Sequence, residues 1–160
     1  MSSQLEVELR VLDERIRTWG LPRYQSEMAA AIDLLACLDE PLILESESPA
    51  VLVPSGIAIH IGDPNVAAVI LPRSGLGHRG LVLGNLVGLL DADFTGQIFL
   101  SCWNRSGPNG EAVTINPGDR IAQLLFMPIL RPSICVVEDF SRPSTRGAGG
   151  FGSTGHSASV

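Results

Sequence analysis

The sequence predicts an all-β fold, and three of its features support this prediction. Apolar segments of strand length follow one another at a spacing of roughly 8–12 residues, which is typical of sandwiches and barrels. The chain contains 17 glycines and 11 prolines, which supply many turns and disfavour long helices. Its 160 residues are 45% hydrophobic, so it is the size of one domain and has enough apolar material for a core.

The expected strands follow in chain order. Leu5, Val7, Leu9 and Val11 alternate with charged residues, as in a half-buried strand. The segment "AVLVPSGIAIHIG" predicts two short strands around a Pro-Ser-Gly turn. Further strands are expected in "NVAAVILP", "GQIFLSCWN", "EAVTINPGDRIAQLLFMPIL" and "SICVVEDF".

Two segments differ from this series. "SEMAAAIDLLACLDE" is rich in Ala and Leu and would be helical by propensity alone, although propensity is a weak guide. From Ser141 onward, apolar periodicity gives way to Ser, Pro, Gly and Thr, which is typical of a mobile arm. We therefore expect a β domain over residues 1–140 and a flexible, glycine-rich C-terminal arm over residues 141–160.

Composition and charge exclude several functions. The net charge of −6 argues against a nucleic-acid partner, and no apolar run approaches the roughly 18 residues of a membrane span. All 11 basic residues are arginines, so a P-loop, which needs its lysine, is excluded, whereas arginine can still bind phosphate. The N-terminus carries charges where a signal peptide has an apolar run, and the three cysteines form no C-x-x-C pair. We therefore expect a cytoplasmic protein.

The C-terminal "RGAGGFGSTG" has the composition of a phosphate-binding loop, because glycine lets backbone N–H groups approach an anion closely. Gly147, Gly149 and Gly152 satisfy the G-x-G-x-x-G fingerprint, but too few residues follow for the helix and strand that a dinucleotide fold requires. Phe151 is the only aromatic residue of the loop, and we expect it to pack on something flat and apolar.

Two further stretches each allow two interpretations. In "LPRSGLGHRG", Arg73, a hydroxyl and free N–H groups at a helical turn form an anion site, but a polar N-cap with a solvated arginine explains them equally well. His78 has no partner nearby in the sequence and is expected to be a surface histidine. Asp33 lies between apolar neighbours and is, taken alone, best explained as a turn cap.

The stretch "LGNLVGLLDADFTGQIF" places Asp91 at the end of an apolar strand, where a carboxylate can serve as a general base for water. The alternative is an acidic hairpin tip. Asn85 carries an amide suited to the edge of a nucleobase, or it is an ordinary turn residue. In "PGDRIAQLLF", a Pro-Gly turn precedes Arg120 and Gln123, which we expect in a strand.

In order and spacing, these five stretches resemble the five motifs of the trimeric dUTPases, and the resemblance runs from about Val7 to Gly155. It implies a distorted jelly-roll β-barrel with one short helix and a mobile C-terminal arm. It further implies a homotrimer in which three subunits build each active site. The implied reaction hydrolyses dUTP to dUMP and pyrophosphate, which supplies dUMP for thymidylate synthesis and keeps uracil out of DNA.

The resemblance also implies a role for each motif residue. Asp91 is the base that activates water for attack on the α-phosphorus, and the phosphate chain is bound by Arg73, Ser74, Gly75 and Gln123. Uracil enters a hairpin slot formed by Asn85, Leu89, Leu90 and the backbone near Phe99. The C-terminal loop is a lid donated to a neighbouring subunit, which acts through Arg146, Phe151, Gly152, Ser153 and Thr154. Mg²⁺ is expected on the triphosphate oxygens, with Asp33 a water-mediated partner at most.

Two positions depart from the motifs. Ala31 stands where the first motif usually has glycine, so its backbone must adopt a conformation that an L-residue tolerates. Phe94 stands where the third motif usually has tyrosine, and it keeps the steric wall against a ribose 2′-hydroxyl while losing the phenol.

Two rival interpretations remain. A dCTP deaminase of the same fold would release ammonia from dCTP. A non-enzymatic binding module with this fold would not turn over dUTP.

Overall fold

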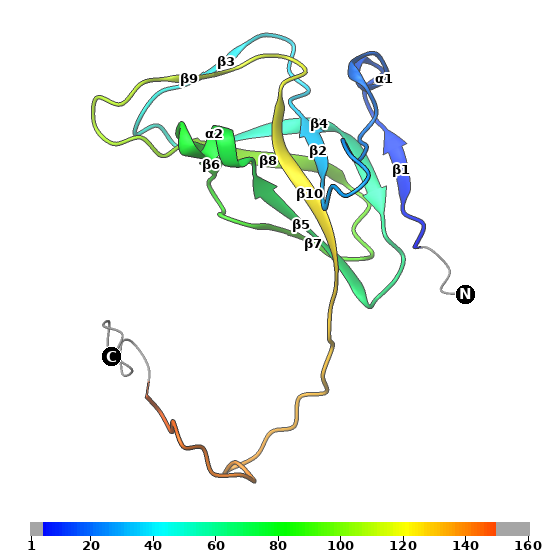
Figure 1. Ribbon diagram of the computed structural model, residues 1–160, viewed down its shortest axis with the longest axis vertical. Coiled ribbons are helices and arrows are strands. Elements are labelled where there is room, and N and C mark those ends of the chain that lie inside the picture. Colours follow the sequence, from blue (N-terminus) through cyan, green and yellow to red (C-terminus); the bar gives the residue numbers. More distant parts are fainter. Residues whose placement is uncertain (1–4, 150–160) are drawn as a thin grey trace. The chain divides into compact units, whose positions relative to one another are not determined.

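The computed structural model describes residues 5–149 (Figure 1). The chain divides into two units, Met1–Leu130 and Arg131–Val160, which are described separately. The first unit therefore ends ten residues before the boundary that the sequence suggested between residues 140 and 141.

The first sheet has the strand order β1-β4-β8-β6, and every pairing in it is antiparallel. Its strands are β1 (Glu8–Val11), β4 (Val51–His60), β8 (Gln97–Asn104) and β6 (Leu81–Leu83). Along β8, the side chains of Ile98, Leu100 and Cys102 are buried in alternation, as expected for a sheet with one face on the core.

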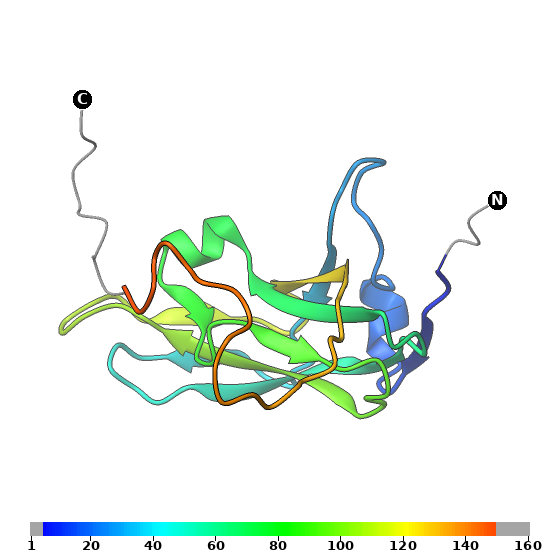
Figure 2. The ribbon, with the colours of Figure 1, turned by 90° about the horizontal axis from the view of Figure 1, so that it is seen from below.

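The second sheet has the order β2-β10-β5-β7 and is also antiparallel. Its strands are β2 (Ile32–Leu35), β10 (Arg120–Pro128), β5 (Val66–Pro72) and β7 (Gly88–Leu90). A third, two-stranded sheet pairs β3 (Leu42–Leu44) with β9 (Val113–Ile115). Figure 2 shows β4, in cyan, and β5, in green, in separate layers of the first unit.

One hydrophobic core joins these sheets. It combines buried residues of the first sheet, such as Val53 and Leu100, with Leu34, Ile70 and Leu124 of the second. The prediction of a mainly β fold is confirmed. The sheets are open, and no closed barrel is found within residues 5–149.

Two short helices accompany the strands within residues 5–149, whereas one was expected. α2 (Ser74–His78) is the helical turn that the Pro-Arg-Ser-Gly stretch predicted. α1 (Arg15–Trp19) was not predicted, and its Ile16 is buried in the core. None of the helices in the described part of the chain is long and apolar enough to cross a membrane.

The structure differs from the sequence patterns at three places. The helical propensity of residues 26–40 is overridden, because β2 pairs with β10 and buries Leu34 and Leu35. Within residues 50–62 the chain forms one long strand, β4 (Val51–His60), with a register shift between Pro54 and Ala58, instead of two strands around a turn. At the N-terminus, Leu5 and Leu9 are 41% and 38% exposed, so only part of the expected half-buried strand contacts the core.

The segment 133–140, expected to be a strand, has no strand assignment. It belongs to the second unit, and its apolar side chains are largely exposed: Ile134 is 86% and Val136 94% exposed. Apolar alternation predicts a strand only where the strand has a partner, and the described residues of this chain provide none.

Candidate active site

Three strands of the second sheet place the first, second and fourth motifs side by side. β10 lies between β2 and β5, and its Gln123 is opposite Asp33 on one side and Leu71 on the other. β5 ends at Pro72, where the extended backbone of Arg73 leads into α2. The antiparallel register therefore brings together residues that lie 90 positions apart in the sequence.

These elements form a groove in the first unit. It is lined by Gln25, Ala31, Asp33, Arg73, Ser74, Gly75, Leu76, Arg79 and Gln123. The groove therefore gathers the predicted phosphate-binding residues of the second and fourth motifs, Arg73, Ser74, Gly75 and Gln123, together with Asp33 of the first motif, which was predicted as a water-mediated partner of Mg²⁺. Gln25 and Arg79 were not predicted as site residues, because the sequence motifs do not indicate which other side chains border the groove.

Charged and amide contacts organise the groove. Arg73 Nε lies 3.0 Å from Asp33 Oδ1, and Arg73 NH1 donates to the Arg120 carbonyl oxygen at 3.0 Å. Arg120 NH1 donates to Asp33 Oδ2 at 3.4 Å. Gln123 Nε2 donates to the Pro72 carbonyl oxygen at 3.0 Å, which ties β10 to the end of β5.

The start of α2 supplies backbone donors beside these side chains. The Arg73 carbonyl accepts from Gly77 N–H at 2.8 Å, so the helix closes after Arg73. The first N–H groups of a helix have no partner within it, and here they belong to Ser74, Gly75 and Leu76. A Cβ atom on Gly75 would meet nothing within 4 Å, so the backbone there is open to an approaching anion. His78 is exposed, as expected.

Ala31 lines the groove without strain. It is not among the non-glycine residues with positive φ in the described chain, which are Glu47, Leu86 and Asn109. The expectation that its backbone takes a conformation suited to an L-residue is confirmed.

The third-motif segment (residues 85–99) is separate from this groove and is not the expected hairpin, because β7 belongs to the second sheet, where it pairs with β5, and β8 to the first, where it pairs with β4 and β6. The segment runs from Asn85 through β7 and a turn, closed by Phe94 N–H donating to the Asp91 carbonyl at 3.1 Å, into β8. Asn85 and Asp91 are exposed, and so are the apolar side chains of Leu89 (66%) and Phe99 (47%). Leu90 is half-buried. The third-motif segment thus presents apolar and polar groups together on an accessible surface.

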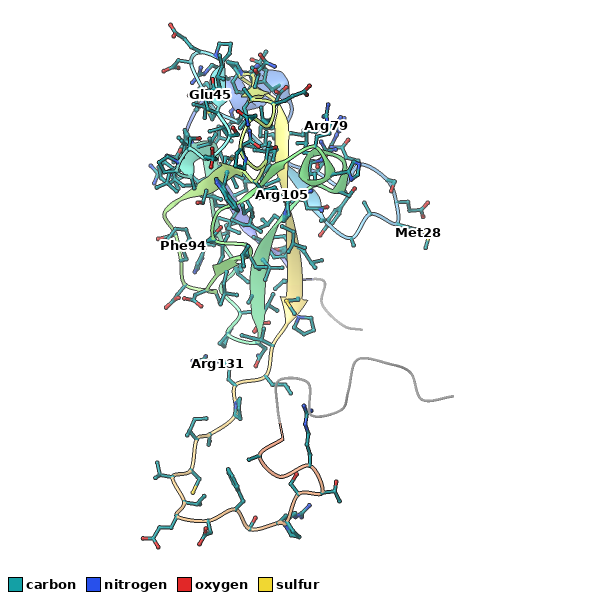
Figure 3. All side chains as sticks on the ribbon, turned by 90° about the vertical axis from the view of Figure 1, so that its left-hand side faces the viewer. Met28, Glu45, Arg79, Phe94, Arg105 and Arg131 are labelled. Carbon is teal, nitrogen blue, oxygen red and sulfur yellow. The ribbon has the colours of Figure 1, made fainter. Side chains whose placement is uncertain are left out.

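Asp91 does not meet the groove within this chain. β7 pairs with β5 so that Leu90 is opposite Ala68 and Gly88 opposite Ile70, and Arg73 follows the other end of β5. Asp91 is thus near the level of Ala67, and the six residues from there to Arg73 span roughly 20 Å of extended chain. Figure 3 shows Phe94 of the third-motif segment and Arg79 of the groove on different sides of the unit.

The fifth motif belongs to the second unit and is described in part. Arg146 Nε donates to the Gly149 carbonyl at 2.9 Å, and Ser144 Oγ accepts from the N–H groups of Arg146 and Gly147. Gly147 has a φ of +54°, which closes this local turn. Phe151, Gly152, Ser153 and Thr154 lie outside the described residues.

Metal ligands are sparse in the described part of the chain. No group of three or more His, Cys, Asp or Glu side chains in residues 5–149 is arranged to hold a metal ion. The only acidic side chain that lines the groove is Asp33, and both of its oxygens face arginines. A cation in this groove would therefore need most of its ligands from a bound anion or from water.

Comparison with known proteins gives consistent results. A family model described as dUTPase matches residues 17–155. The deoxyuridine 5'-triphosphate nucleotidohydrolase of Idiomarina loihiensis is 53% identical over 154 residues, covering 95% of this chain and 99% of that protein. The protein of the same name from Xanthomonas campestris pv. campestris is 56% identical over 157 residues, covering 97% and 99%.

Solved structures share the fold at lower identity. The Staphylococcus bacteriophage 80alpha dUTPase with dUpNHpp matches with a TM-score of 0.81 at 23% identity, covering 96% of this chain and 100% of that one. A mutant dUTPase from phage phi11 of S. aureus matches with a TM-score of 0.72 at 22% identity, covering 86% and 99%. The latter structure concerns the coordination of a structural Mg(II) ion in that protein.

Proposed function

This chain belongs to the dUTPase family, and we propose from that premise that its groove and its third-motif segment are parts of one active site shared between copies of the chain. The chain is a dUTP diphosphatase, like the relatives that it matches over nearly its whole length. The reaction consumes one water and cleaves dUTP to dUMP and pyrophosphate.

The observation that supports a shared site is the separation of Asp91 from Arg73 along β5. A general base must lie within hydrogen-bond reach of the water it activates, and that water must lie beside the bound phosphate. One chain does not satisfy both conditions, because Asp91 and Arg73 lie near opposite ends of the strand. A homotrimer that combines the groove of one copy with the third-motif segment of another would satisfy them.

The proposed chemistry is attack of water on the α-phosphorus. The Asp91 carboxylate accepts a proton from the water as its oxygen bonds to the α-phosphorus, and the bond to the bridging oxygen breaks to release pyrophosphate. Arg73, Gln123 and the N–H groups of Ser74 and Gly75 bind the phosphate oxygens and stabilise the charge that develops there.

The third-motif segment is proposed to select the base and the sugar. Asn85, Leu89, Leu90 and the backbone near Phe99 would line a slot for uracil, and cytosine would leave buried donors and acceptors unpaired. Phe94 would stand under the deoxyribose and exclude a 2′-hydroxyl. The arm would then close the site through Arg146 and the terminal glycine-rich loop, with Phe151 on the uracil face.

Mg²⁺ fits this groove as a partner of the substrate. When bound with the triphosphate, Mg²⁺ would neutralise part of the phosphate charge and hold the phosphate groups of the substrate in one geometry. Asp33 would reach it through water at most, because the carboxylate already faces Arg73 and Arg120. We further propose a cytoplasmic role that supplies dUMP and keeps uracil out of DNA.

The test is pyrophosphate release measured in parallel with dUTP, UTP, dCTP and dTTP, with ammonia release measured for dCTP. Rapid release from dUTP alone is expected. Ammonia from dCTP would indicate a deaminase instead, and binding of dUTP without turnover would indicate a binding module.

A further inference from the structure

Arg120, which the proposed chemistry does not use, contacts Arg73 and Asp33 together. Its carbonyl oxygen accepts a hydrogen bond from Arg73 NH1 at 3.0 Å, and its own NH1 donates to Asp33 Oδ2 at 3.4 Å. Asp33 Oδ1 lies 3.0 Å from Arg73 Nε. The three residues therefore form a closed set of contacts, in which Asp33 and Arg73 line the groove and Arg120 lies outside its lining.

Asp33 is the shared element of this set. Its side chain is only 13% exposed, and each of its two oxygens faces a different arginine. A carboxylate held at both oxygens cannot rotate without breaking one contact. The direction in which Arg73 points its remaining N–H groups is thus set by Asp33, and the orientation of Asp33 is set in part by Arg120.

The backbone of Arg120 is itself fixed. The turn before it is tied to the end of β2 by Gly118 N–H donating to the Ala36 carbonyl and by Ala36 N–H donating to the Asp119 carbonyl, both at 2.8 Å. The Arg120 side chain is 49% exposed. Its truncation would therefore leave the core intact and alter mainly the contact to Asp33.

We propose that Arg120 is a positioning residue for phosphate binding: by holding Asp33 from the side opposite Arg73, it keeps the Arg73 guanidinium directed into the groove. Without Arg120, both oxygens of Asp33 become available to Arg73. A bidentate pair would then form and draw the guanidinium donors away from the ligand. The inference rests on the proposed function only in naming the ligand as the polyphosphate of dUTP.

The experiment compares wild type with Arg120→Gln in the full chain, using two readouts. Steady-state kinetics give kcat and KM for dUTP, and calorimetry gives the Kd for inorganic tripolyphosphate. We expect KM and Kd to rise about tenfold and kcat to stay within about threefold, because neither Asp91 nor the reacting water is touched. Arg120→Lys should recover most of the loss, because it keeps a cation beside Asp33.

A double-mutant cycle separates positioning from direct contact. In an Asp33→Asn background, Arg120→Gln should change the tripolyphosphate Kd by less than about twofold, since the carboxylate through which it acts is gone. The matched control is Arg79→Gln, which removes the same charge from the groove but has no ion pair among the described residues. Its effect should be the same in both backgrounds.

Additive effects of Arg120→Gln and Asp33→Asn would overturn the proposal and make Arg120 a direct ligand. Unchanged tripolyphosphate binding by Arg120→Gln would overturn it as well, even if dUTP hydrolysis is confirmed. If wild type does not hydrolyse dUTP, the proposed function fails while the tripolyphosphate measurements still decide the role of Arg120. Thermal unfolding verifies each fold, and Arg120→Met, which keeps the apolar stem, replaces the Gln variant if that variant does not fold.

Discussion

Phe94 lies directly over Gly96. A Cβ atom on Gly96 would be 2.8 Å from Phe94 Cζ, closer than such atoms approach in folded proteins. Gly96 is not among the described glycines with positive φ, so its backbone does not require glycine. Space for the aromatic ring is the reason for the glycine, and the ring position is therefore set by this contact.

Gly96→Ala should displace the Phe94 ring and lower kcat/KM for dUTP by about tenfold, because the ring is proposed to contact the deoxyribose of the substrate. The same change in a Phe94→Ala background should lower kcat/KM for dUTP by less than about threefold, since no ring remains to be displaced. Equal losses in the two backgrounds would show that Gly96 acts independently of Phe94.

The same ring is expected to exclude ribose. Phe94→Ala should raise the UTP/dUTP ratio of kcat/KM by about tenfold or more, whereas Phe94→Tyr should change it little. An unchanged ratio in Phe94→Ala would mean that another wall excludes the 2′-hydroxyl.

Asp91→Asn tests the general base. The two side chains are nearly isosteric, so the variant should bind dUpNHpp about as well as wild type. It should lose about 100-fold or more in kcat, because an amide does not accept the proton of the attacking water. Calorimetry gives the Kd for dUpNHpp, and pyrophosphate release gives kcat for dUTP. A kcat within a few-fold of wild type would show that Asp91 is not the general base.

A buried thiol predicts how stability depends on alkaline pH. Burial raises the pKa of Cys102 to about 12, from a usual value near 9. Between these values the unfolded chain loses the proton while the folded chain keeps it, so the free energy of unfolding falls as pH rises from about 9 to 12. Cys102→Ala should have a lower Tm at pH 8, because it leaves a cavity, but a smaller further decrease between pH 8 and pH 10.5. Equal decreases in Tm between pH 8 and pH 10.5 in wild type and Cys102→Ala would contradict the raised pKa of Cys102 as the cause.

The sequence predicted those strands that follow the alternation of a half-buried sheet. Along β8, odd and even positions differ in burial, and the expected bounds match the observed ones within a residue. β2 could not be found this way, because it lies in an Ala- and Leu-rich stretch that favours a helix locally, and only the pairing with β10 makes it a strand.

The candidate site was predictable at the level of motifs and unpredictable at the level of contacts. The spacing of Arg73, Ser74 and Gly75 indicates an anion site without any structure. The contact of Arg120 with Asp33 depends on the register of β10 against β2, including a shift between Arg120 and Ala122, and no local pattern encodes that register.

The donation of the C-terminal loop across subunits can be tested by mixing two inactive proteins. One is Asp91→Asn with an intact arm, and the other is a chain that ends at Ser144 and keeps Asp91. If each site takes Asp91 from one subunit and the loop from the next around a three-fold ring, every mixed trimer contains one repaired site. Random mixing of equal amounts makes about three quarters of the trimers mixed, so activity should return to about a quarter of wild type. The proteins must be co-expressed or refolded together, and differently tagged chains must be recovered in one trimer as the control. If base and loop came from the same chain, no mixture could regain activity, so recovery near zero in confirmed mixed trimers would overturn the shared site.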